Sequence, residues 1–240
     1  IKIRSVLSGM PELKLGLNDK VLFDSGRLTS NNIVKSVEME DFRFHQCVKL
    51  DKFESDRTIS FIPPDGDFEL LSYRVAMEEG GKPPIWVDCT IERWSPSCVE
   101  YLIKVKAQLK RKQTANDVEI LIPVPDDADT PKFKTSVGYA QFKPARSAIL
   151  WHVGSLPHGK EFTMRARLGR PSVKADDMAN DNILQLPIKV GFEIPYSTLS
   201  GLQVRYLKVQ DKSGYAAVPW VRYISQNGEY NFRMPDHNIQ

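Results

Sequence analysis

Apolar and polar residues alternate along most of the chain, which is the period of a β-strand with one buried face. A clear case is 13–17, where Leu13, Leu15 and Leu17 alternate with charged or flexible residues. Apart from short turns, no stretch has the 3.6-residue period of an amphipathic helix. The pattern therefore predicts an all-β protein.

The alternating runs are short and are separated by turn signals such as Pro63-Pro64-Asp65-Gly66. Many short strands at spacings of about 8–15 residues are typical of β-sandwiches. The predicted strands are 1–7, 13–17, 21–23, 37–39, 42–48, 58–62, 68–73, 85–93, 99–108, 118–122, 132–142, 149–153, 161–167, 184–195, 202–209, 220–224 and 229–232. The clearest linker is 78–84 (EEGGKPP), because it combines charge, two glycines and two prolines.

The stretch 200–233 carries the strongest hint of a binding site. Trp220 and Arg222 alternate onto one face, directly after Pro219, which has no backbone N–H and therefore suits an exposed or edge strand. A ring beside a guanidinium can stack on and hydrogen-bond an aromatic side chain of a partner, while a free strand edge offers main-chain bonds. A core tryptophan beside a solvated arginine is the structural alternative, and the pattern alone leaves both open.

A basic cluster lies in KVKAQLKRKQ, with Lys104, Lys106 and Lys110 at one parity and Arg111 and Lys112 beside them. On a strand it would form a stripe that attracts phosphates, anionic lipid heads or acidic peptides. A solvated sheet face explains it equally well. Nucleic acid is disfavoured, since the stripe lacks the exposed aromatic side chains of RNA-binding sheets.

Composition excludes several other classes. The chain has 240 residues, 41% of them hydrophobic and 26% charged, with a net charge of +3, which are ordinary globular values. No apolar run reaches the roughly 20 residues of a membrane span. The three cysteines have no Cys-x-x-Cys spacing and fit buried thiols in a reducing compartment. Because the sequence opens at Ile1 without Met and without a signal peptide, we expect it to be part of a longer protein.

No catalytic motif stands out. There is no phosphate-binding glycine loop, nucleophile elbow or His-Glu-x-x-His. The carboxylates Asp65, Asp67 and Glu69 sit on and beside a turn with no histidine or cation in sequence reach, so we interpret them as structural. The sequence predicts neither an enzyme nor a bound cofactor or metal.

Several long motifs resemble the mu homology domain of the medium (mu) chains of clathrin adaptor complexes. They occur in the family's order across almost the whole chain: LSGMPELKLGLNDKVLFD, FHQCVKLDKFESDRTISFIPPDGDFELLSYR, KRKQTANDVEILIPVPDDADTPKFKTSVG, SAILW, GKEFTMRA, VRYLKV and SGYAAVPWVRYISQNGEY. TANDVEILIPVPDDADTPKF and SGYAAVPWVRYI are more similar to the Golgi and endosome type, that of adaptor complex one, than to the plasma-membrane type.

The resemblance implies an elongated all-β fold in which a second β-sandwich is inserted into a first. The expected bounds are 1–83 for the first part of subdomain A, 84–188 for the inserted subdomain B, and 189–240 for the part that completes subdomain A.

The resemblance also implies a binding site for Tyr-x-x-Φ signals, where Φ is a bulky hydrophobic residue. The signal would bind as an added strand. Motif by motif, Arg4, Trp220 and Arg222 correspond to the tyrosine pocket. The Φ pocket corresponds to Val204, Leu207 and Val221. The residues Lys82, Lys106, Lys110 and Arg111 align with a basic patch that can receive acidic clusters.

In the family an early strand adds a Phe and an Asp to the tyrosine pocket, and the resemblance assigns neither residue here. The implied function is recognition of membrane-protein tails for vesicle transport between the trans-Golgi network and endosomes. Implied partners are cargo tails, the large and small adaptor subunits, clathrin, an Arf-family GTPase and phosphoinositide membranes, the last three through the complex. The implied location is the cytoplasm, on the cytosolic face of Golgi, endosome and coated-vesicle membranes. The alternative is a docking subunit that uses its basic stripe for acidic-cluster peptides or anionic lipids.

Overall fold

The computed structural model describes residues 1–18, 37, 39–75, 82–95, 97–170, 186–210, 217–227 and 229–233. The predicted strand 21–23 and most of the predicted linker 78–84 lie outside these ranges. The chain packs as two units, one of Ile1–Gly81 with Thr198–Tyr223 and one of Lys82–Ser197 with Ile224–Gln240. Both units are built mainly from antiparallel strands, so the predicted all-β class is confirmed.

The first unit holds eight described strands and one short helix. They are β1 (Lys2–Ser5), β2 (Glu12–Leu17), β3 (Met39–Phe44), β4 (Val48–Lys49), α2 (Leu50–Asp56), β5 (Ile59–Phe61), β6 (Gly66–Glu69), β7 (Leu71–Val75) and β16 (Val204–Gln210). One sheet has the order β16-β2-β5-β4, and two smaller sheets pair β1 with β6 and β3 with β7. The alternating leucines of β2 are buried here with Ile59 and Phe61, as the sequence pattern predicts.

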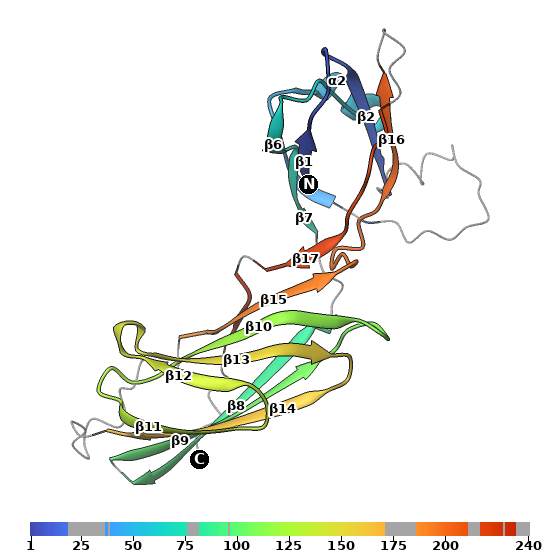
Figure 1. The fold of residues 1–240 in the computed structure, drawn as a ribbon. Coiled ribbons are helices and arrows are strands. Elements are labelled where there is room, and N and C mark those ends of the chain that lie inside the picture. The colour runs from blue at the N-terminus through green and yellow to red at the C-terminus, as the bar shows by residue number, and fades with distance from the viewer. Residues whose placement is uncertain are drawn as a thin grey trace. The chain divides into compact units, whose positions relative to one another are not determined.

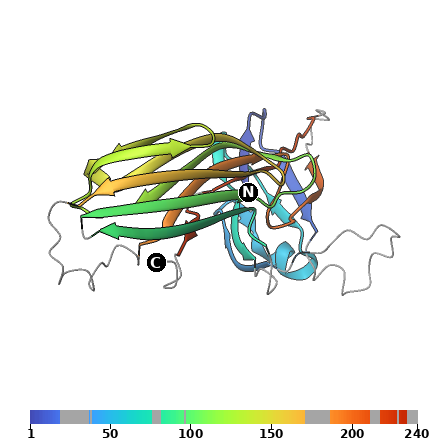
Figure 2. The same cartoon turned by 90° about the horizontal axis from the view of Figure 1, so that it is seen from below.

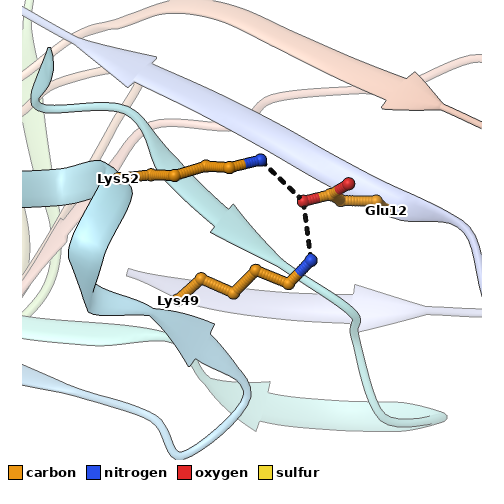
Figure 3. A network of polar contacts seen from close by, with 3 residues as sticks. All are labelled: Glu12, Lys49 and Lys52. Carbon is orange, nitrogen blue, oxygen red and sulfur yellow. Dashed lines mark hydrogen bonds and ion pairs between the residues drawn. The ribbon is translucent and has the colours of Figure 1, made fainter.

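The helix α2 was not predicted, because its seven residues bury only Phe53 and so give no periodic signal. Its start is tied to the sheet by Glu12 of β2, whose Oε1 accepts hydrogen bonds from Lys49 Nζ at 3.0 Å and Lys52 Nζ at 3.3 Å (Figure 3). The bond from Lys49, then that from Lys52, lowers the pKa of the Glu12 carboxyl below its ordinary value. In the part of the chain that the structure describes, no helix is long and apolar enough to cross a membrane.

The second unit consists of two larger sheets. Its elements are β8 (Ile85–Ser95), β9 (Cys98–Ala107), β10 (Thr114–Pro123), β11 (Asp129–Thr135), β12 (Tyr139–Lys143), the 3₁₀ turn η1 (Pro144–Arg146), β13 (Ala148–Pro157), β14 (Glu161–Gly169), β15 (Ile188–Pro195), β17 (Ile224–Gln226) and β18 (Asn231–Phe232). The sheets have the orders β11-β14-β9-β8 and β12-β13-β10-β15-β17, with β18 also on β15. Figure 1 and Figure 2 show them as two stacked layers.

The core of this unit lies between the layers. In β9 the residues Val99, Tyr101, Ile103 and Val105 are buried, while Lys104 and Lys106 on the opposite face are exposed. From the other sheet Trp151 is fully buried, and its indole N–H donates to the carbonyl of Val137 at 3.0 Å. Every second residue of β9 therefore faces the core, and the lysines between them lie on an outer surface.

The packing units differ from the subdomain bounds expected from the sequence. Residues 189–197 and 224–240 were expected in subdomain A but fall in the second unit, because β15 pairs with β10 and both β17 and β18 pair with β15. The first unit takes only 198–223 from the C-terminal part of the chain. The expected subdomain bounds therefore remain a prediction.

Candidate functional site

Strand β16 lies at the edge of its sheet. In the described ranges β2 is the only strand that pairs with it. Because the backbone groups of an antiparallel strand point alternately to its two sides, an edge strand offers a row of amides and carbonyls to a further chain. This edge is therefore suited to accept an extended peptide by strand addition.

A bulge in β16 determines which of its side chains reach the core. Val204 pairs with Leu17 and Tyr206 pairs with Gly16, so Arg205 is an extra residue in the ladder. Consequently Val204 and Leu207 both pack against the core of the first unit while remaining partly exposed. The two residues assigned to the Φ pocket thus lie together on one face of the edge strand.

The opposite face of β16 is anchored by Tyr206. Its ring lies over Gly16 so closely that a Cβ there would be 2.2 Å from the ring carbon Cε1. Its hydroxyl is 3.1 Å from Thr58 Oγ1, and Lys208 Nζ is 5.4 Å from the ring centroid. These contacts hold the edge strand against β2 from the side opposite the core.

The segment 217–223 brings three further candidate residues beside β16. The Tyr223 hydroxyl accepts a hydrogen bond from the backbone N–H of Val204 at 3.0 Å, and this contact ties the segment to the bulge. Trp220 is 76% exposed, Val221 is 45% exposed and Arg222 is exposed. The alternative of a core tryptophan is therefore wrong.

The strand predicted over 220–224 is also wrong for most of its length, since Ile224 is the first residue in a ladder. Pro219 lacks an amide hydrogen, and the segment is held through the Tyr223 side chain instead of by main-chain pairing. The side chains at 220–222 consequently project from an irregular segment, where no neighbouring strand covers them in the described ranges.

Arg4 lies on β1, in the same unit, and pairs in register with Asp67 of β6. Its Nε is 4.0 Å from Asp67 Oδ1, and both side chains are 79% exposed. An ion pair this exposed contributes at most about 1 kcal/mol, so the guanidinium can exchange this partner for another at little cost. Among the described residues no hydrogen bond or ion pair joins Arg4 to Trp220 or Arg222.

The basic residues Lys82, Lys106, Lys110 and Arg111 belong to the second unit and are all exposed. The backbone N–H of Gln108 donates to the carbonyl of Pro84 at 2.8 Å, which brings the start of β8 and the end of β9 together. This bond places Lys82 and Lys110 near the same end of the sheet. The cross-strand neighbours of Lys106 are Trp86 on β8 and Glu161 on β14, so one of its two direct neighbours carries a carboxylate.

Sequence reasoning missed two residues of this region. Asp67 was grouped with the turn carboxylates, and only the β1–β6 register reveals Arg4 opposite it. Tyr223 was not singled out, although a tyrosine next to an exposed Trp-Val-Arg run is a signal for a side chain that anchors that run. In the described ranges no group of three or more His, Cys, Asp or Glu side chains is placed to hold a metal ion.

Comparisons with known proteins identify relatives over nearly the whole chain. Residues 1–234 match the family model described as "Adaptor complexes medium subunit family". The chain is 58% identical over 235 residues to "AP-1 complex subunit mu-1-I" of Caenorhabditis elegans and 55% identical over 233 residues to "AP-1 complex subunit mu-2" of Homo sapiens. These matches cover 98% and 97% of this chain but 53% of each relative, so the chain spans about half their length.

Solved structures share the fold at low sequence identity. The mu homology domain of Fcho1 from Danio rerio, solved with a bound Eps15 peptide, matches with a TM-score of 0.59 and 14% identity over 95% of this chain and 80% of that chain. The yeast delta-COP-I mu-homology domain matches with a TM-score of 0.50 and 15% identity over 86% of this chain and 76% of that chain. The predicted mu homology fold is therefore confirmed.

Proposed function

Because the chain belongs to the adaptor complexes medium subunit family, we propose that it is a cargo-recognition domain that binds Tyr-x-x-Φ signals in the cytosolic tails of membrane proteins. The family is one of adaptor subunits, not enzymes. The similarity to AP-1 mu chains favours sorting between the trans-Golgi network and endosomes over uptake at the plasma membrane. The observation that carries the proposal is the open edge of β16, flanked by exposed Trp220 and Arg222.

The tyrosine of the signal is expected to bind against Trp220, with its hydroxyl bonded to Arg4 or Arg222. An indole stacks well on a phenol ring, and a guanidinium supplies donors for the hydroxyl oxygen. Arg4 is available for this, since its present partner Asp67 is a weak one at 4.0 Å. A tyrosine hydroxyl bound without a partner would cost about 1–3 kcal/mol, so these donors give the site its preference for tyrosine over other apolar side chains.

The Φ residue is expected to contact Val204, Leu207 and Val221. The bulge in β16 puts the first two on one face, where they are packed on the core below and still partly open above. Burying a bulky aliphatic side chain there removes apolar surface from water on both partners. The site would therefore require size and apolarity at Φ and no particular polar group.

We further propose that the longer protein acts as the medium subunit of a heterotetrameric adaptor with large and small subunits. Through that complex it would meet clathrin, an Arf-family GTPase and phosphoinositide membranes, on the cytosolic face of Golgi, endosome and coated-vesicle membranes. The similarity to AP-1 mu chains supports this assignment.

Calorimetric titration of a Tyr-x-x-Φ peptide tests the cargo proposal. The chain, extended by whatever residues precede Ile1 in the natural protein, should bind with micromolar affinity, as is usual for transient recognition. Tyr→Ala in the peptide or Trp220→Ala in the protein should remove binding. Tyr→Phe should weaken binding about 5–100-fold, and a phosphotyrosine peptide should not bind because the site is shaped for a neutral phenol. Equal affinity for the tyrosine and alanine peptides would overturn the proposal.

A second candidate is a docking subunit that uses Lys82, Lys106, Lys110 and Arg111 for acidic-cluster peptides or anionic lipids. The exposure of all four residues near one end of the β8–β9 sheet favours it. Mutations distinguish the two candidate functions. Trp220→Ala should abolish tail binding only if the first candidate is right. Lys106→Gln/Lys110→Gln should abolish tail binding only if the second is right.

A further inference from the structure

A row of lysines crosses the sheet β16-β2-β5-β4 and begins at its open edge. Lys208 of β16 pairs in register with Lys14 of β2, which pairs on its other side with Ser60 of β5. Ser60 in turn pairs with Lys49 of β4. Residues that pair directly across neighbouring strands project from the same face of a sheet. Three lysines and one serine therefore form a line across four strands, and no member of this line carries a carboxylate.

The row lies on the outer face of the sheet. On β16 the two residues that flank Lys208, Leu207 and Val209, pack against the buried cluster of the first unit. Since successive side chains of a strand point to opposite faces, Lys208 projects away from that core, and it is exposed. Its Nζ is 5.4 Å from the ring centroid of Tyr206, the next residue of β16 on the outer face. The first cation of the row is therefore at the surface, beside the open strand edge.

Two of these lysines lack an acidic partner. Among the described residues, no carboxylate lies within ion-pair distance of Lys14 or Lys208. Glu12 is on the same face of β2, two residues before Lys14, but its Oε1 already accepts hydrogen bonds from Lys49 and Lys52 (Figure 3). Like charges placed directly opposite each other destabilise a sheet. The pair of Lys14 and Lys208 therefore costs stability and leaves a positive charge at the open edge.

The hydrogen-bonding pattern of β2 shows which main-chain groups of β16 are open. The backbone N–H of Asn18 donates to the carbonyl of Gln203 at 3.1 Å, so Asn18 and every second residue before it on β2 turn their main-chain groups toward β16. Lys14 is one of these residues, and the main-chain groups of its partner Lys208 consequently point to β2. Those of the two residues that flank Lys208 point to the open edge, where a further strand can bond them.

We propose that Lys208, with Lys14 behind it, makes this edge select signal peptides that carry an acidic residue at one defined position. The inference rests on the proposed binding of a Tyr-x-x-Φ peptide by strand addition to β16. An added strand extends the row by one member, so one peptide residue lies directly opposite Lys208 on the outer face. Directly opposite residues have Cβ atoms about 5 Å apart, a distance that a lysine and a glutamate side chain bridge readily.

Strand alternation confines the preference to a single peptide position. The neighbouring peptide side chains point to the other face, where Val204 and Leu207 are assigned to the Φ residue. Peptide residues two positions away share the outer face with Lys208, but they lie about 7 Å from it, so their charge has a weaker effect. A general attraction by the net positive charge of the chain would act on every position alike.

Fluorescence anisotropy with a scanned set of peptides tests the proposal. The reference peptide carries the tyrosine and Φ residues of the signal with alanine at every other position, and Glu, Gln or Lys then replaces each alanine in turn. At one position Glu should bind about two- to fivefold more tightly than Gln, the range for an opposite-charge pair across strands, and Lys should bind more weakly than Gln. The difference should shrink as salt is added, because the pair is exposed to solvent.

Variants of the chain assign the preference to the row. Lys208→Gln should remove the difference between the Glu and Gln peptides at that position, and Lys208→Glu should reverse it in favour of the Lys peptide. The matched control is Lys132→Gln, which removes the same charge from an exposed lysine of the second unit. This control should keep both the preference and the affinity for the reference peptide within about twofold. Thermal unfolding checks that each variant is folded.

The outcomes separate this inference from the proposed function. If the reference peptide binds no better than its Tyr→Ala version, the proposed function is overturned and the inference with it. If the reference peptide binds but Glu, Gln and Lys give equal affinities at every position, only the inference is overturned. A gain from Glu of similar size at all positions, retained in Lys208→Gln, would also overturn it, in favour of attraction by the net charge of the chain.

Discussion

Two tryptophans of this chain should respond in opposite ways to replacement by alanine. Trp220 is 76% exposed, so truncating it removes little buried surface and should change the free energy of unfolding by less than about 0.5 kcal/mol. Trp151 is fully buried and donates its indole N–H to the carbonyl of Val137. Its truncation leaves a cavity and an unpaired carbonyl, and should cost about 3–5 kcal/mol.

The effect on peptide binding should be reversed. An exposed tryptophan that stacks on a ligand is a typical hot spot, so Trp220→Ala should cost at least about 2 kcal/mol of binding, roughly 30-fold in affinity. Trp151→Phe, which keeps most of the volume and the fold, should leave the affinity unchanged within about twofold.

Urea unfolding followed by circular dichroism measures the stabilities, and calorimetry with a Tyr-x-x-Φ peptide measures the affinities. The reasoning is refuted if Trp220→Ala destabilises the fold by more than about 2 kcal/mol, because the side chain would then be a structural one. It is also refuted if a stable Trp220→Ala variant binds the peptide as tightly as the wild type.

Four other predictions concern the framework. The pKa of the Glu12 carboxyl is lowered in the folded state, so its ion pairs stabilise the fold at pH values above the unfolded pKa of about 4.3. This stabilisation is lost as the pH falls through the folded pKa. Glu12→Gln should therefore lower the free energy of unfolding by about 1 kcal/mol at pH 7 and leave it unchanged in acid. Burial raises the pKa of the Cys89 thiol to about 12, so a thiol reagent at pH 8 should label Cys89 only after unfolding. Gly16→Ala should destabilise by about 1–3 kcal/mol because its Cβ meets the Tyr206 ring, and adding Tyr206→Ala should relieve part of that loss in urea unfolding. Asn227→Ala should cost about 1–3 kcal/mol in the same assay, since it leaves a backbone amide and a backbone carbonyl of β15 without their side-chain partner.

Strand alternation was sufficient to predict most of this fold, and its failures have local causes. The run 132–142 was predicted as one strand but forms β11 and β12, separated by a turn at 136–138. Gly138 has φ +65° there, and a Cβ on it would be 1.8 Å from the carbonyl oxygen of His152, so only glycine suits the position. That glycine inside an apolar run was a readable signal of the turn.

The site was only partly predictable for a different reason. Residue types and motif order pointed to Trp220 and Arg222, but their exposure depends on how an irregular segment is held by the Tyr223 hydroxyl. Likewise, the pairing of Arg4 with Asp67 arises from strand register between segments more than sixty positions apart. Register is set by tertiary packing and turns, which a single sequence does not reveal.

A crystal structure of the chain with a bound Tyr-x-x-Φ peptide tests the central claim most directly. The account predicts an extended peptide hydrogen-bonded along the open edge of β16, with its tyrosine ring against Trp220. The tyrosine hydroxyl should lie about 3 Å from a guanidinium nitrogen of Arg4 or Arg222, and the Φ side chain should contact Val204 and Leu207. A peptide bound at any other surface, with the β16 edge left open, would contradict it.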